Sequence, residues 1–114
     1  MANKFLKETT FQLEKDFLNI GVNFDIEKPV QDYKKLFSFA STLVNTLNEQ
    51  DPKRILNLIY RIDLPEEKVQ SEMQISSLTF SELLAELIVK REIQKVIMKY
   101  YTQTLKINSI LQPI

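Results

Sequence analysis

Three basic residues in the C-terminal part of the chain have the spacing that would let them contact phosphates together. Arg91, Lys95 and Lys99 follow at intervals of four, which places them on one helix face, with Tyr100 and Tyr101 close by. Cations beside stacking aromatic rings are the minimal outline of a nucleic-acid surface. Basic residues also complement the negative end of a helix and form ordinary solvated faces. We favour the solvated face and keep nucleic-acid binding through this basic stripe as the alternative function.

Paired carboxylates are the other candidate for chemistry. Glu82 and Glu86 share a helix face, and Glu66 and Glu67 are adjacent. Helical carboxylate metal sites normally combine Glu with a Glu-x-x-His motif, and the chain has no histidine. We therefore predict no catalytic residue and no metal site among them.

The residue types that the sequence lacks exclude several classes of enzyme. Without cysteine there can be no disulfide, thiolate nucleophile or thiolate metal site, and without histidine no Ser-His-Asp triad. A single glycine, Gly21, is too few for phosphate-binding loops of the Walker or dinucleotide type. Fifteen basic and fifteen acidic residues give a formal net charge of zero, so no overall field favours an anionic or a cationic partner. These absences predict a non-enzymatic protein without a cofactor. The alternative that they leave open is an enzyme that relies only on Asp, Glu, Lys, Arg, Tyr or Ser.

Glycine and proline divide the chain into stretches of helical periodicity, and its 114 residues suit one domain, 1–114. We predict an all-α, compact bundle of about five helices near residues 4–20, 30–49, 52–62, 65–74 and 79–102, the last being a long spine. The alternative for the last helix is that it continues to Leu111, because no Gly or Pro intervenes before Pro113. Residues 21–28 are predicted to form an extended connector. The expected helix-end signals are Gly21 at C′, Pro29 in a first turn, Asp51 before Pro52, and a Thr79/Glu82 capping box.

The fifth predicted helix carries two apolar stripes that are rotated from one another by more than a right angle. One contains Phe80, Leu83, Leu84, Leu87 and Ile88, and the other contains Val89, Ile93, Val96, Ile97 and Tyr100. A central helix that meets different neighbours along its length would bury both stripes, and we favour that interpretation. The alternative is that the second stripe is an interface between subunits, because symmetric dimers commonly pair a long helix with its own copy.

Two segments, 59–67 (IYRIDLPEE) and 84–96 (LAELIVKREIQKV), resemble a loose group of short, uncharacterised bacterial helical proteins. The resemblance covers the C-terminal half and implies a bacterial, cytosolic setting but no activity and no site residue. The N-terminal residues lack an apolar run of signal-peptide length, and no segment is apolar enough to span a bilayer, so we expect a cytoplasmic protein without membrane contact. The resulting prediction is a small helical protein-interaction module that forms a homodimer or binds another protein.

Overall fold

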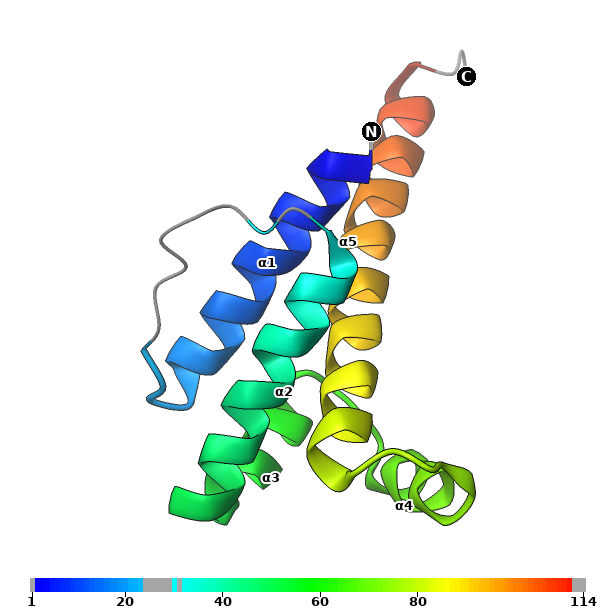
Figure 1. Ribbon diagram of the computed structural model, residues 1–114. Helices are drawn as coiled ribbons and strands as arrows, with labels where there is room; N and C mark the ends of the chain where they lie inside the picture. The colour runs from blue at the N-terminus through cyan, green and yellow to red at the C-terminus, as the bar shows by residue number, and fades with distance from the viewer. Residues whose placement is uncertain (1, 24–29, 31, 112–114) are drawn as a thin grey trace.

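The computed structural model describes residues 2–23, 30 and 32–111, and this part of the chain folds into five helices without a strand (Figure 1). The helices are α1 (Ala2–Asn19), α2 (Tyr33–Gln50), α3 (Pro52–Arg61), α4 (Glu66–Ile75) and α5 (Phe80–Leu111). The prediction of an all-α bundle with a long C-terminal helix is confirmed.

Gly21 ends α1 as predicted. Its φ of 82° lies in the left-handed region, which a residue without Cβ adopts at low cost. The Gly21 amide donates to the Leu18 carbonyl, and the Val22 amide donates to the Phe17 carbonyl. This pair of hydrogen bonds is the Schellman motif, which satisfies carbonyls that the helix itself leaves unpaired.

The second helix begins three residues later than predicted. Asp32 is its N-cap, and one side-chain oxygen of Asp32 accepts a hydrogen bond of 2.8 Å from the Lys35 amide. The prediction of a start at residue 30 relied on Pro29. The helix starts after Asp32 instead, because the Asp32 side chain caps the Lys35 amide of the first turn. Pro29 itself, and residues 24–28 of the predicted extended connector, lie outside the described residues.

Two later helix ends follow the predicted signals with different side-chain contacts. Pro52 opens α3, but the Asp51 carboxylate pairs with Arg54 at 3.1 Å instead of capping an amide. At the start of α5 the Thr79 hydroxyl accepts from the Glu82 amide at 3.2 Å and donates to the Glu82 carboxylate at 2.8 Å. Threonine therefore caps α5 as predicted.

α5 is the spine of the bundle, and it packs against α1, α2 and α4. Its first half is enclosed on several sides, with Leu84, Ile88 and Val89 fully buried. α4 is short and contributes only Val69 to the buried core. The C-terminal turns of α5 extend beyond the other helices (Figure 1). α5 continues past residue 102 to Leu111, the longer of the two ends predicted for it.

Among the described residues, no helix has the length and hydropathy that crossing a membrane requires.

Candidate functional site

Two buried acidic side chains meet where α1 packs on α5. Asp16 of α1 is 1% exposed, and Glu92 of α5 is completely buried. Asp16 lies beside Phe17 and three residues after Leu13 on the buried side of α1, so the turns that build the core also place its carboxyl inside. An ionised carboxylate in such a place is costly unless it is paired or loses its charge.

Asp16 is paired. The Lys95 ammonium donates to Asp16 Oδ2 at 3.1 Å, and Arg61 Nε lies 3.6 Å from Asp16 Oδ1. Gln12, one turn earlier on α1, donates from Nε2 to both carboxylate oxygens at 3.3 Å. Contacts from α1, α3 and α5 therefore converge on a single carboxylate.

Glu92 has no such support. Neither of its oxygens has a hydrogen-bond donor within the described chain, and Lys95 Nζ is no nearer than 4.0 Å to Oε1. Burial, reinforced by the hydrogen bond and charge of Asp16, raises the pKa of Glu92 to about 9, against the weaker opposing pull of Lys95 and Arg91. Glu92 is therefore neutral at physiological pH.

The two carboxyl groups behave as one titrating pair. Burial alone would raise the pKa of Asp16, but hydrogen bonds with Glu92, Lys95 and Gln12 outweigh it and lower that pKa. A proton on Glu92 supplies the donor that the pair otherwise lacks, and Asp16 keeps the negative charge that Lys95 needs. Because both groups are closed off from solvent, the pair can hold a proton but cannot reach a substrate.

Two members of the predicted basic stripe form contacts with other parts of the chain. Lys95 binds Asp16, and Arg91 Nε donates to the Ile62 carbonyl at 2.9 Å, which ties α5 to the end of α3. Lys99 is exposed. Of the three cations of the stripe, Arg91 and Lys95 form contacts within the chain, and Lys99 is the one that is exposed.

The predicted interface stripe also contains both buried and exposed residues. Val89 and Val96 are buried inside the chain, and Ile93 packs against its core. Ile97 is the member that faces solvent, with half of its surface exposed.

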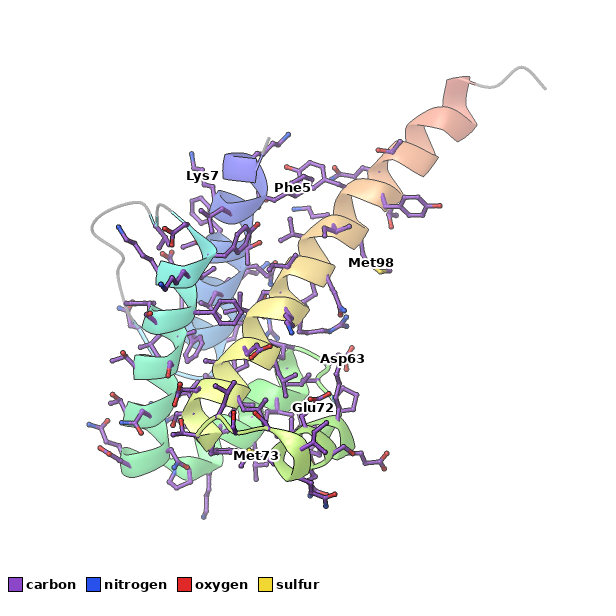
Figure 2. The ribbon with its side chains drawn as sticks, turned by 45° about the vertical axis from the view of Figure 1, so that its right-hand side comes forward. Phe5, Lys7, Asp63, Glu72, Met73 and Met98 are labelled. Carbon is purple, nitrogen blue, oxygen red and sulfur yellow. The ribbon has the colours of Figure 1, made fainter. Side chains whose placement is uncertain are left out.

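Tyr100, the last member of the predicted interface stripe, contacts α1. Its ring meets Phe5 edge-on with centroids 5.3 Å apart, and Lys4 Nζ lies 4.7 Å from the ring centre. Its hydroxyl donates to Glu8 at 3.0 Å. Tyr100 is therefore an anchor for α1 in this fold, and Figure 2 shows Phe5 on α1 close to α5.

Both members of the predicted carboxylate pair Glu82 and Glu86 have structural partners. Glu82 accepts from Thr79 at the start of α5, and Glu86 forms an ion pair of 2.7 Å with Lys90. Both glutamates line an open hollow of about 440 Å³ between α2 and α5, together with Phe37 and Leu78. Within the described chain, no group of three or more acidic residues is placed to hold a metal ion.

Asp16 and Glu92 were not predicted as site residues, although the sequence contains a signal for both. Glu92 lies four residues after Ile88 and four before Val96, so it interrupts a row of apolar residues on one helix face. Asp16 lies three residues after Leu13, within the apolar stripe of α1. A lone carboxylate inside an apolar stripe marks a buried ionisable group.

Comparison of the chain with family models, curated proteins and solved structures gave no match.

Proposed function

We propose that the chain is a small, cytosolic, non-enzymatic helical interaction module that binds a second copy of itself through the outer face of α5. One observation carries the proposal. Ile97, Met98 and Tyr101 form an exposed apolar group on the second half of α5, with 50%, 61% and 64% of their surfaces open to solvent. We call these three residues the outer patch.

The outer patch is one continuous helix face. At about 100° per residue its members lie within an arc of about 100°, which is the width of an amphipathic stripe that packs on a neighbour. The opposite side of this half of α5 is covered, because Val96 is buried and Tyr100 contacts α1. Met98 projects from the side of α5 away from α1 (Figure 2).

The same face of α5 is covered in the first half of the helix. Leu83 precedes Tyr101 by about five helical turns and Leu87 precedes Met98 by about three, so each pair points the same way. Leu83 and Leu87 are buried, and α4 packs on this part of α5. The outer patch thus continues a face that is buried elsewhere, and it becomes exposed where α4 no longer covers it.

A second copy is the partner that this surface fits best. Two α5 helices related by a two-fold axis would bring the same apolar residues of each copy together, as isologous dimers do. A formal net charge of zero means that no overall repulsion keeps copies apart. The in-chain contacts of Arg91 and Lys95 favour this proposal over nucleic-acid binding, because they occupy two of the three stripe cations.

The proposal predicts that Ile97→Glu converts a dimer to a monomer. A buried, unpaired glutamate at the centre of the interface would be strongly unfavourable, whereas the same residue on a solvated helix face costs the monomer little. Light scattering and sedimentation velocity at tens of micromolar would give the mass, and far-ultraviolet circular dichroism would show that helical content is retained.

Leu56→Glu is the matched control. Leu56 lies on α3 and is 47% exposed, so the change in side chain and in exposure is nearly the same. This variant should remain dimeric. A wild-type chain that is monomeric at these concentrations, or equal masses for the two variants, would contradict the proposal. A salt-dependent mobility shift with DNA or RNA would support the alternative in its place.

A further inference from the structure

We propose that α1 is a proton-dependent cover on α5: its docking takes up one proton at the Asp16 and Glu92 pair, and its release uncovers the Val96 and Tyr100 side of α5. This inference goes beyond the proposed self-association and does not depend on it.

The α1–α5 seam is unusually polar for a helix interface in this bundle. Asp16, Glu92 and the hydroxyl of Thr9 are all buried, and further out along the seam Tyr100 donates to Glu8. The interface between α2 and α5 differs, because every buried residue of α2 is apolar and the polar contact across it, from the Ser81 hydroxyl to the Asn45 side chain, is uncharged. Charge at the seam therefore acts on the docking of α1 much more than on the docking of α2.

The polar and charged groups that act on Glu92 come from α1, α3 and α5. Asp16 of α1 and the Lys95 and Arg91 side chains of α5 act on Glu92 directly. Gln12 of α1 and Arg61 of α3 act on it through their contacts with Asp16. When α1 departs, Glu92 loses both its burial and the Asp16 carboxylate. These are the two causes of its raised pKa, so the group returns towards its ordinary value of 4.5.

The direction of the proton linkage follows from these two states. Between the ordinary pKa of Glu92 and about 9, the docked state carries a proton that the undocked state releases. Asp16 has a lowered pKa and is ionised in both states over this range, so it adds no opposing proton. Each rise of one pH unit therefore raises the equilibrium constant for undocking of α1 about tenfold. This holds up to the pH at which Glu92 ionises while α1 is still docked.

Hydrogen exchange tests the proposal on the whole chain. Amide protection factors of α1 and α2, corrected for intrinsic exchange at each pH, would be measured by mass spectrometry from pH 5.5 to 8.5. For the wild type, the protection of α1 should fall about tenfold per pH unit and should lie below that of α2 at every pH, because α1 undocks while α2 stays folded. Glu92→Gln cannot ionise, so its α1 protection should be nearly independent of pH.

Glu86→Gln, which removes a partly exposed carboxylate from the same helix, should behave as the wild type does. If Glu92→Gln loses helical content, Glu92→Met provides the same comparison with an apolar side chain. The proposal is overturned if wild-type α1 protection does not change with pH, or if the folded Glu92 variant retains the wild-type slope. It is also overturned if α1 and α2 have the same protection at every pH, because α1 would then leave α5 only when the whole chain unfolds.

Discussion

Lys95→Met should lower the free energy of unfolding at pH 7 by about 3 kcal/mol, the low end of the range for breaking a buried ion pair. The Asp16 carboxylate, whose side chain is 2% exposed, would remain buried after losing its nearest cation. Arg61 would still lie 3.6 Å away, and the Lys95 side chain is itself 27% exposed, so the loss should not reach the upper end of that range. Urea denaturation followed by circular dichroism would measure the change.

Lys99→Met is the matched control for this prediction. It removes the same charge from the next turn of the predicted basic stripe, but Lys99 is exposed. Its effect should stay within about 0.5 kcal/mol, as for most surface substitutions. Equal losses for the two variants would mean that Lys95 does not stabilise Asp16 in the way its 3.1 Å contact indicates.

The stability of the wild type should fall as the pH rises from 5 to 8, which is the reverse of the usual effect of a salt-bridged carboxylate. The pKa of Glu92 is raised to about 9 on folding, so the native state holds a proton that the unfolded state has released over this range. One such proton changes the free energy of unfolding by about 1.4 kcal/mol per pH unit, or roughly 4 kcal/mol in total.

The effect of Asp16 on the pH dependence of stability has the opposite sign to that of Glu92. Its pKa is lowered on folding, so its contribution is present above its ordinary pKa of 3.8 and is lost as the pH falls through its folded value. Stability should therefore be greatest near pH 5. Glu92→Met should be more stable than the wild type at pH 8 and should have a much flatter profile, because an apolar side chain of similar size replaces a buried polar group. A wild-type profile that rises from pH 5 to 8 would be incompatible with a protonated Glu92.

The sequence was sufficient to predict the fold because local signals and apolar periodicity agree along most of it. Gly21, Pro52 and Thr79 mark helix ends that the structure confirms. The start of α2 was predicted too early because two competing signals, Pro29 and Asp32, lie three residues apart. Only the structure shows that the Asp32 side chain accepts from the Lys35 amide.

The buried site was much harder to predict, because it joins residues that are far apart in the chain. Asp16 and Lys95 are separated by 79 positions, and nothing in the spacing of either helix indicates which faces meet. Lys95 therefore looked like one member of a solvated row with Arg91 and Lys99. Helical spacing shows that residues share a face, but it does not show whether a neighbouring helix covers that face.

The protonation of Glu92 can be measured directly by nuclear magnetic resonance, from the carbon-13 chemical shift of its side-chain carboxyl carbon as a function of pH. Glu92→Gln would assign the resonance. We predict that Glu92 keeps the shift of a protonated carboxylic acid through neutral pH and titrates near pH 9. A Glu92 resonance that titrates near pH 4.5 would show that the buried pair does not hold a proton, and the proton-dependent docking of α1 would then be wrong.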